Sequence, residues 1–166
     1  MHEPAVIRAA AKDDSATIAR IYNHYIAHTV VTFEEEVISA AEIGRRMDDV
    51  LSASLPYLVA EQNGVVIGYA YAAKWRLRSA YRFSVETTVY LDADHQGKGF
   101  GTRLYEALLE ELRARGFHAA MGGIALPNAG SVALHEKLGF RQVAHFAEVG
   151  FKFGKWIDTG YWQCVF

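Results

Sequence analysis

The sequence predicts a single α/β domain, spanning residues 1–166, in which a mixed, mostly antiparallel twisted sheet carries helices on both faces. A length of 166 residues fits one domain and allows a substantial core. Hydrophobic residues make up 51% of the chain and charged residues 22%, which is a globular balance. Two predicted helices come first, and predicted strands then alternate with two further helices, an order typical of such a sheet.

The first half of the chain predicts a strand, two helices and a hairpin. An apolar stripe at helical spacing runs through residues 18–26, after the N-cap candidates Asp13, Asp14 and Ser15. The Ser-Ala-Ala-Glu sequence at 39–42 has the capping-box form and opens a second helix. Asn63-Gly64 suits the positive φ angles of a two-residue hairpin turn. We therefore expect a strand at 6–8, helices after 15 and 39, and hairpin strands at 57–62 and 65–73.

The second half predicts strands that alternate with two helices. Leucines between residues 104 and 112 form the core side of a helix, and Gly116 suits its left-handed C-cap. Asn128 is placed to cap the next helix. We expect helices at 99–115 and 129–138, and strands at 83–91, 118–124, 141–150 and 161–166.

Composition, charge and the lengths of the apolar runs argue against several classes of protein. The net charge of −2 leaves no broad basic field, which disfavours nucleic-acid binding. The single cysteine, Cys164, cannot form an internal disulfide or a cysteine-based metal cluster, and we expect a buried packing thiol and no metal site. The N-terminal segment lacks the apolar region of a signal peptide, and the longest apolar run, 65–73, is too short to span a bilayer. We expect a soluble, cytoplasmic protein without membrane contacts.

A glycine-rich turn between a predicted strand and a predicted helix is the most informative segment. Three glycines alternate within residues 96–102, and Lys98 adds a positive charge. Glycines let backbone amides approach a ligand, and a helix N-terminus favours phosphate oxygens. The Walker pattern requires Ser or Thr where Gly99 stands, and the dinucleotide fingerprint requires Gly where Thr102 stands. Taken alone, such glycines are as compatible with a purely structural turn.

With this turn, the sequence resembles the GNAT acetyltransferase superfamily. The family's Gln/Arg-x-x-Gly-x-Gly/Ala loop corresponds to Gln96-Gly97-Lys98-Gly99-Phe100-Gly101, and its later Asn, helix and Gly-Phe correspond to Asn128 and Gly139-Phe140. Within the superfamily, the chain resembles the phosphinothricin and methionine sulfoximine acetyltransferase branch. The segments that carry this narrower resemblance are 23–26, 85–90, 135–140, 154–158 and 160–163.

The resemblance implies the GNAT fold, acetyl-CoA as co-substrate and a homodimer. It implies backbone contacts to the co-substrate from the end of one strand, diphosphate contacts from the glycine-rich turn, and contacts to the pantetheine and adenosine arm from the start of the last helix. These positions are Val89, Tyr90, Leu91, Gln96, Gly97, Lys98, Gly99, Phe100, Gly101, Thr102, Asn128 and Ser131.

Two side chains are candidates for proton transfer. Glu86 lies on the strand that leads into the glycine-rich turn, where a carboxylate can accept the amine proton directly or through water. The alternative is an exposed or salt-bridged strand glutamate. His135 stands where many GNAT enzymes carry a tyrosine acid, and imidazole can act as acid or base. Its alternative is a structural histidine. For the thioester oxyanion we expect a backbone N–H near Val89 or Tyr90, where strand pairing should be interrupted.

The acceptor site is expected around two arginines. Arg76 and Arg78 are two positions apart, so in extended chain they share a face and can bind carboxylate, phosphinate or sulfonyl oxygens. The branch has Lys and Arg here, so Arg76 is a variation, and a solvated basic loop is the alternative. The expected walls of the site are Phe33, Tyr81, Thr88 and Tyr90, although aromatic residues of this kind are commonly plain core.

These features predict an N-acetyltransferase that moves an acetyl group from acetyl-CoA to a small, anionic, amino-acid-like amine by direct attack. An alternative acceptor is another amine, such as a protein N-terminus, lysine, polyamine or aminoglycoside; the two arginines disfavour polycations. A second alternative is a non-catalytic CoA-binding sensor, since fold does not determine function. The presence of both Glu86 and His135 disfavours the sensor.

Overall fold

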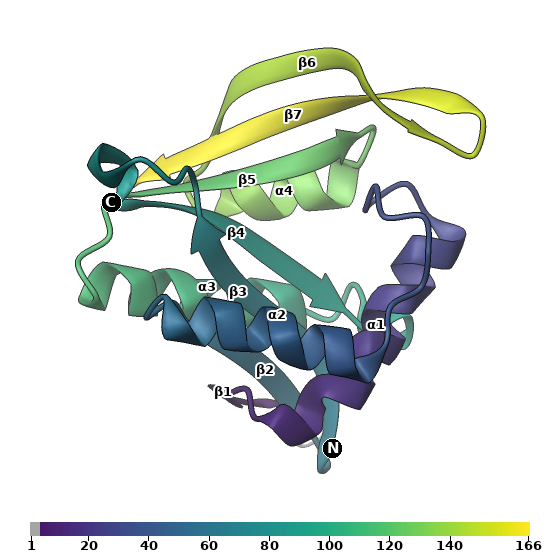
Figure 1. The fold of residues 1–166 in the computed structure, drawn as a ribbon, viewed down its shortest axis with the longest axis vertical. Coiled ribbons are helices and arrows are strands. Elements are labelled where there is room, and N and C mark those ends of the chain that lie inside the picture. The colour runs from purple at the N-terminus through teal and green to yellow at the C-terminus, as the bar shows by residue number, and fades with distance from the viewer. Residues whose placement is uncertain (1–3) are drawn as a thin grey trace.

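The computed structural model describes residues 4–166 (Figure 1). Its strands are β1 (Val6–Ala9), β2 (Tyr57–Gln62), β3 (Val65–Lys74), β4 (Ser84–Leu91), β5 (Ala119–Leu126), β6 (Arg141–Lys152) and β7 (Lys155–Val165). Its α-helices are α1 (Ser15–His28), α2 (Ala40–Ser52), α3 (Phe100–Ala114) and α4 (Ala129–Lys137). Short 3₁₀ turns are η1 (Lys12–Asp14), η2 (Ser79–Tyr81) and η3 (Ala93–His95). The element order agrees with the order that the sequence predicts.

The strands form one seven-stranded sheet in the order β1-β2-β3-β4-β5-β7-β6. Neighbouring strands are antiparallel except for β4 and β5, which are parallel. The β4–β5 pairing is short, because it joins only residues 84–86 to residues 119–121. Beyond Glu86 the two strands diverge, and Figure 1 shows them spreading apart toward the N-terminus of α3. This divergence splits the sheet and opens the site described below.

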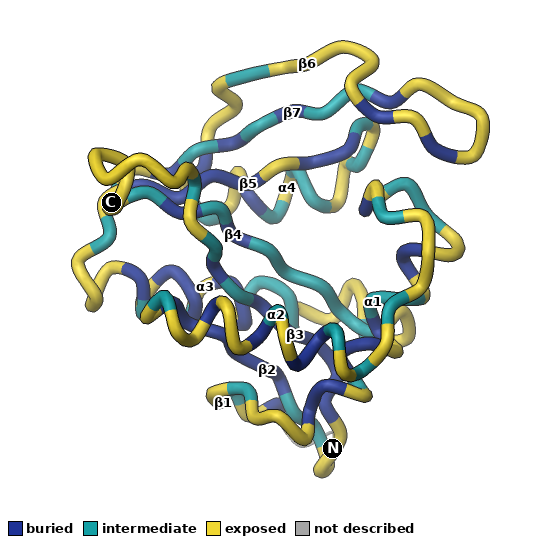
Figure 2. Tube along the Cα trace, viewed as in Figure 1, coloured by how far each residue is buried: buried dark blue, intermediate teal, exposed yellow. Residues whose placement is uncertain are grey.

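Helices cover both faces of the β2–β3 half of the sheet. Residues 57–60 and 66–70 are buried without alternation, which is typical of strands that are covered on both sides. Helices α1 and α2 lie on one face and α3 on the other (Figure 1), and the buried residues run through the middle of these layers (Figure 2). The leucines of α3 that the sequence assigns to the core are at most 2% exposed.

Local signals in the sequence correctly place most element ends. The Ser39 side chain accepts a hydrogen bond from the Glu42 N–H at 3.1 Å, as the cap pattern predicts. Asn63 and Gly64 have φ angles of 51° and 76° in the hairpin turn, and Gly116 has a φ of 84° after α3. Left-handed backbone of this kind is where glycine carries no steric cost.

Asp14, one of the three predicted candidates, stands at the N-cap position of α1, but its side chain makes no hydrogen bond to the first residues of that helix. The Asp14 carboxylate instead accepts a hydrogen bond from the Ala11 N–H at 2.7 Å and pairs with Arg8 at 2.8 Å. An acidic residue before a helix can accept hydrogen bonds from several nearby backbone N–H groups. Here Asp14 accepts one from Ala11, which precedes the 3₁₀ turn η1.

The last strand begins earlier than predicted, at Lys155 and not at Tyr161. Phe153 and Gly154 form the turn, with φ angles of 53° and 72°. A phenylalanine in left-handed backbone is uncommon, so the dipeptide does not carry the Asn-Gly signal used to recognise such turns. Strands β6 and β7 therefore form one long hairpin that projects beyond the rest of the sheet (Figure 1).

Further sequence-level expectations concern the cysteine, metals and membranes. Cys164 is buried, as expected. Among residues 4–166, no helix combines the length and apolar character needed to cross a membrane. Within the same range, no group of three or more His, Cys, Asp or Glu side chains is placed to hold a metal ion.

Candidate active site

A cavity of about 210 Å³ occupies the divergence between β4 and β5. Its wall combines the end of β4, the end of β5, the start of α4 and the loop between α1 and α2. The residues that line it are Val31, Thr32, Glu86, Thr87, Thr88, Val89, Tyr90, Gly123, Ile124, Ala125, Asn128, Ser131 and His135. Seven of these are candidates that the sequence identifies: Glu86, Thr88, Val89, Tyr90, Asn128, Ser131 and His135.

The backbone of β4 faces this cavity without a strand partner on the β5 side. Pairing with β3 continues to Leu91, whereas pairing with β5 ends at Glu86. In an antiparallel pair, alternate N–H and C=O groups point away from the partner strand. Alternate amides between residues 87 and 90 therefore point into the gap. The interruption of strand pairing near Val89 and Tyr90 is confirmed.

The glycine-rich turn lies at the end of the same strand. Gly97 and Gly99 have φ angles of 72° and 83°, and a Cβ at either position would meet no atom within 4 Å. Gly99 is the N-cap of α3 and no side chain caps the helix. The first amides of α3 lack intrahelical partners, so this turn can present donors to an anionic ligand.

The side chains of Gln96 and Lys98 form hydrogen bonds that fix the first part of the turn. The Gln96 amide donates to the Tyr25 hydroxyl at 2.6 Å, and that hydroxyl donates to the Leu91 carbonyl at 2.5 Å. The Lys98 ammonium donates to the Asp94 carbonyl at 2.9 Å. Because these contacts hold the turn before a ligand arrives, its shape is preorganised.

The start of α4 provides a second helix N-terminus at the cavity. The Asn128 carbonyl oxygen Oδ1 accepts a hydrogen bond from the Ser131 N–H at 3.1 Å, which confirms the predicted cap. Asn128 and Ser131 both line the cavity. The diverging strands and this second helix start line the cavity, whereas Leu91 and the glycine-rich turn at 96–102 lie outside its lining, at the end of β4.

The whole chain is similar to known acetyltransferases. The model of the acetyltransferase (GNAT) domain family matches residues 7–160. The chain belongs to the GNAT acetyltransferase family. The phosphinothricin N-acetyltransferase of Streptomyces viridochromogenes is 43% identical over 162 residues, covering 96% of this chain and 87% of the relative. The L-methionine sulfoximine/L-methionine sulfone acetyltransferase of Salmonella typhimurium is 40% identical over 157 residues, covering 95% of this chain and 92% of the relative.

Solved structures agree with this membership. A putative acetyltransferase from Salmonella typhimurium, solved with its cofactor acetyl-CoA, superposes with a TM-score of 0.94 at 38% identity, over 98% of this chain and 94% of the other. A phosphinothricin acetyltransferase from Sinorhizobium meliloti, in complex with acetyl-CoA, has a TM-score of 0.94 at 38% identity, over 98% and 88% of the two chains. The predicted GNAT fold and the predicted family are confirmed.

Glu86 of this GNAT protein is half-buried beside the cavity. Burial raises the pKa of its carboxyl group, and the nearby positive charge of Arg76 partly offsets that rise. Within residues 4–166 no cation forms an ion pair with Glu86, so the alternative of a salt-bridged strand glutamate does not describe it. A carboxylate whose pKa is raised toward neutrality is a stronger base than an ordinary surface glutamate.

His135 lies in a buried hydrogen-bonded chain. Its Nδ1 is 2.8 Å from the Ser131 carbonyl oxygen, and its Nε2 is 3.0 Å from the Tyr105 hydroxyl. The Tyr105 hydroxyl is in turn 2.5 Å from the Thr87 hydroxyl. Because a carbonyl only accepts, Nδ1 carries the proton and Nε2 of the neutral ring accepts from Tyr105. Burial lowers the pKa of His135, which favours this neutral form.

The ring of His135 lies directly against β5. A Cβ added at Gly122 would be 2.4 Å from Nε2, so only glycine leaves room for the ring. Sequence reasoning does not find Tyr105, Thr87 or Gly122. The available signals are a tyrosine within the leucine stripe of α3 and a pair of glycines inside a strand, which often marks close approach of another group.

Of the expected acceptor residues, the structure brings only Thr88 and Tyr90 to the cavity wall. Arg76 and Arg78 do not lie in one continuous extended strand, because β3 ends at Lys74 and the segment after it bends. The shared face predicted for them is therefore wrong. The Arg76 guanidinium lies 4.2 Å from the centre of the Trp75 ring, and that of Arg78 lies 5.6 Å from the centre of the Tyr81 ring. Phe33 is 40% exposed and lies outside the cavity lining.

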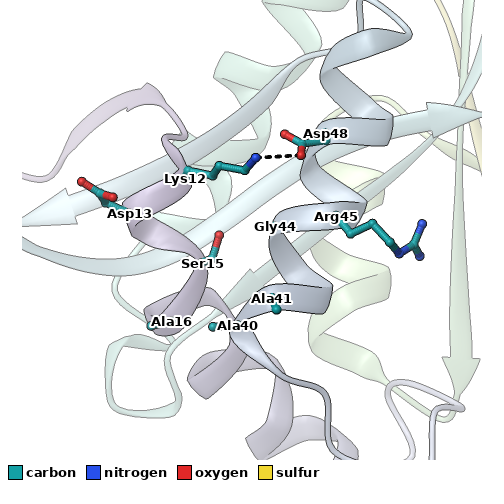
Figure 3. Close-up of a pocket in the computed structure, with 9 residues that line it drawn as sticks. All are labelled: Lys12, Asp13, Ser15, Ala16, Ala40, Ala41, Gly44, Arg45 and Asp48. Carbon is teal, nitrogen blue, oxygen red and sulfur yellow. Dashed lines mark ion pairs between the residues drawn. The ribbon is translucent and has the colours of Figure 1, made fainter.

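A second hollow, of about 490 Å³, lies between the η1–α1 segment and α2 (Figure 3). Small residues form its floor and an ion pair between Lys12 and Asp48, at 2.9 Å, crosses its end. It shares no lining residue with the cavity between β4 and β5. It is therefore not part of the candidate active site.

The glycine-rich turn supports a direct test of ligand binding. Gly99→Ala is expected to raise the Kd for acetyl-CoA about tenfold, because a left-handed alanine costs roughly 1–2 kcal/mol and shifts the amides of the turn. Isothermal titration calorimetry measures this change. Gly64→Ala is the matched control: Gly64 has a φ of 76° and open space around it, but lies in a distant hairpin. An equal loss of affinity in both variants would contradict the assignment.

Proposed function

We propose that this protein transfers the acetyl group of acetyl-CoA to the amino group of a small, anionic, amino-acid-like acceptor of the phosphinothricin, methionine sulfoximine or methionine sulfone type. The observation that carries the proposal is the divergence of β4 and β5 just beyond Glu86, which leaves a desolvated carboxylate and unpaired strand amides at one cavity, on the strand that leads into the glycine-rich turn. The activities named for the relatives support the acceptor class. We further propose that the enzyme works in the cytoplasm, where acetyl-CoA is made.

The residues present fit acetyl-CoA as the co-substrate. The amides from Gly97 to Thr102 bind the diphosphate, helped by the positive end of the α3 dipole. Alternate amides from Val89 to Leu91 bind the pantetheine arm and the carbonyl oxygen of the thioester. Donors fixed in a strand are already oriented, so they stabilise the negative charge that develops on this oxygen without reorganisation.

Glu86 is proposed as the base. It takes a proton from the acceptor's ammonium group, directly or through one water, and the freed amine attacks the thioester carbonyl. A carbon–nitrogen bond forms, the carbon–sulfur bond breaks, and CoA leaves as a thiolate that takes up the second proton of the attacking nitrogen, so the products are the amide and the CoA thiol. Binding both reactants in one cavity supplies proximity, which can lower a barrier by several kcal/mol.

His135 is proposed to position the site and not to exchange the amine proton. Both of its ring nitrogens have protein partners, and Nε2 faces Tyr105. Acting as a base would require Nε2 to give up a buried hydrogen bond that no other group replaces. The ring instead ties α4, which provides Asn128 and Ser131, to the β4 strand through Tyr105 and Thr87.

Arg76 is proposed to recognise the anionic group of the acceptor. It is close enough to Glu86 to lower that residue's pKa, so an anion on Arg76 would hold an adjacent amine near the base. Trp75 supports the guanidinium plane, while Thr88 and Tyr90 form the wall. Arg78, Tyr81 and Phe33 are proposed to enclose the part of the acceptor that extends beyond the cavity.

An acceptor panel tests this function. In a thiol-release assay with acetyl-CoA, we expect turnover with methionine sulfoximine, methionine sulfone or phosphinothricin, and little turnover with spermidine or lysine peptides. Arg76→Gln is expected to raise the acceptor KM at least tenfold, because a charge-assisted pair is lost, and to leave the KM for acetyl-CoA unchanged. Preferred turnover of a polyamine or a protein N-terminus would replace the proposed acceptor class. Binding of acetyl-CoA without turnover of any amine would favour the sensor.

We also propose a homodimer formed through the β6–β7 hairpin. Exposed apolar side chains lie along this hairpin, at Val143, Phe146, Val149, Phe151, Phe153 and Trp156. Trp156 is 64% exposed, and its ring packs against that of Phe151 with 4.8 Å between ring centres and 53° between the ring planes. A concentrated aromatic surface of this kind is typical of an interface between protein chains.

The dimer proposal predicts that Trp156→Asp shifts the protein to monomer. A buried, unpaired carboxylate would disfavour association strongly. Analytical ultracentrifugation measures the change, with Val6→Asp as control, because Val6 is 62% exposed on β1 at the opposite edge of the sheet. A monomeric wild-type protein at tens of micromolar would contradict the proposal.

A further inference from the structure

Lys152, on β6, is a buried cation that the site described so far does not use. It is only 1% exposed, and its Nζ donates a hydrogen bond to the Thr32 carbonyl oxygen at 2.8 Å. Among residues 4–166, no carboxylate forms an ion pair with it. Removing an ammonium group from water is costly, and an apolar side chain of similar length would fill the same space at lower cost. The contact with Thr32 is therefore the feature to explain.

Thr32 belongs to the loop between α1 and α2 and lines the cavity. It is 8% exposed, and its hydroxyl is 2.8 Å from the Tyr22 hydroxyl. The same hydroxyl accepts a hydrogen bond from the Glu34 N–H at 3.3 Å. Lys152 adds the third constraint, on the carbonyl oxygen. Contacts from α1, from the loop itself and from β6 thus fix this wall residue.

Phe33, which follows Thr32 in the loop, also contacts β6. A Cβ added at Gly150 would lie 2.4 Å from Cζ of Phe33, so the Phe33 ring sits where only glycine leaves room. Gly150 and Lys152 are two positions apart on β6, and residues at this spacing share one face of a strand. That face of β6 therefore contacts Thr32 and Phe33, while Phe151 between them is 53% exposed.

The position of this loop relative to the cavity indicates which reactant it serves. The glycine-rich turn and the start of α4, which are proposed to bind acetyl-CoA, belong to the helices α3 and α4. The loop with Thr32 and Phe33 instead joins α1 to α2, which lie on the face of the sheet opposite to α3 (Figure 1). An amine that attacks the thioester from the α1–α2 side would contact this loop.

We propose that Lys152 and Gly150 are positioning residues for the acceptor: they hold Thr32 and Phe33 as a fixed wall of the acceptor site. This inference rests on the proposed function, because the acceptor is what the wall would contact. The hairpin that is proposed to form the dimer is then also the support of the acceptor site. Its Gly150 and Lys152 contact the loop, while Phe151 between them and its ring partner Trp156 are exposed.

The test compares two variants with a control on the same hairpin. Lys152→Met keeps the length of the side chain and removes its donor, and Gly150→Ala displaces Phe33 without touching Lys152. Lys155→Met, at the exposed start of β7, is the control. We expect both test variants to raise the acceptor KM about tenfold, because an ordered wall is lost, and to leave the KM for acetyl-CoA within twofold.

Hydrogen exchange in the ligand-free enzyme provides a readout that does not depend on turnover. Amides of residues 29–35 are expected to exchange faster in both test variants than in the wild type or in Lys155→Met. Unchanged exchange in this loop would overturn the inference, as would equal rises of both KM values. If the wild-type enzyme acetylates none of the acceptors, the proposed function fails, while the exchange data still decide whether Lys152 and Gly150 hold the loop.

Discussion

Replacing Glu86 by Gln is expected to lower kcat by about 10²–10⁴-fold, the usual contribution of a positioned general base. The amide keeps the shape of the side chain but cannot accept the proton of the amine. Affinity for acetyl-CoA should be unchanged in calorimetry, because the amides proposed to bind it belong to other residues of β4 and to the glycine-rich turn. Steady-state kinetics of thiol release measure the loss.

The pH dependence of the activity provides a second test of Glu86 as the base. The base works only when it is deprotonated, and burial raises the Glu86 pKa above its ordinary value of 4.5. Activity of the wild-type enzyme should therefore fall on acidification at a higher pH than an exposed glutamate would give. This acid limb should be absent from the residual activity of Glu86→Gln.

Glu61→Gln is the matched control for Glu86→Gln. Glu61 is also a half-buried strand glutamate, but it pairs with Arg8 at 2.7 Å on β2, away from the cavity. We expect its kinetics to match the wild type. If Glu86→Gln lowers kcat by less than tenfold and keeps the acid limb, Glu86 is not the base, and His135 becomes the candidate.

Gly122→Ala is expected to damage both stability and activity. The new methyl group would lie 2.4 Å from Nε2 and 2.7 Å from Cδ2 of His135, so the buried ring must move. Overpacking of this kind costs typically 1–3 kcal/mol of unfolding free energy. Movement of the ring also breaks its hydrogen bond with Tyr105 and displaces α4, so turnover should fall at least tenfold.

Chemical denaturation and NMR of the His135 ring measure these effects. In the wild-type protein, Nδ1 should carry the proton and Nε2 should not, and this signature should change in Gly122→Ala. Gly130→Ala is the control: Gly130 lies near the start of α4, and an added Cβ would meet only Asn128 Oδ1, at 3.9 Å. Wild-type stability together with an unchanged ring signature in Gly122→Ala would show that the site tolerates the methyl group.

Short-range signals account for most of the fold. The Ser39 cap, the Asn63-Gly64 turn, Gly116 and the Asn128 cap each depend on a few adjacent residues, so the sequence contains the whole interaction. Two local predictions failed because the same residue types allow more than one local structure. The Asp14 carboxylate binds the Ala11 N–H and not the first amides of α1. Phe153-Gly154 forms a turn although phenylalanine is uncommon in left-handed backbone.

The candidate site also has parts that the sequence predicts and parts that it does not. The glycine-rich turn and Asn128 are recognisable because their residue types and spacing are those expected at the start of a helix that binds an anionic ligand, and Glu86 because it precedes that turn on the same strand. The orientation of Arg76 and Arg78 was not recognisable, because it depends on where β3 ends and on the rings against which each guanidinium packs. Sequence spacing describes a shared face only while the chain stays extended.

By itself, the sequence determined the order of the elements, the family and the glycine-rich turn that is proposed to bind acetyl-CoA, because these depend on contacts between near neighbours in the chain. Only the tertiary structure decided where β4 and β5 part, which tautomer His135 adopts beside Tyr105, and that Lys152 and Gly150 contact the loop at Thr32 and Phe33. Lys152 is 120 residues from its partner. Contacts over such separations are set by the packing of the whole sheet, and no local pattern records them.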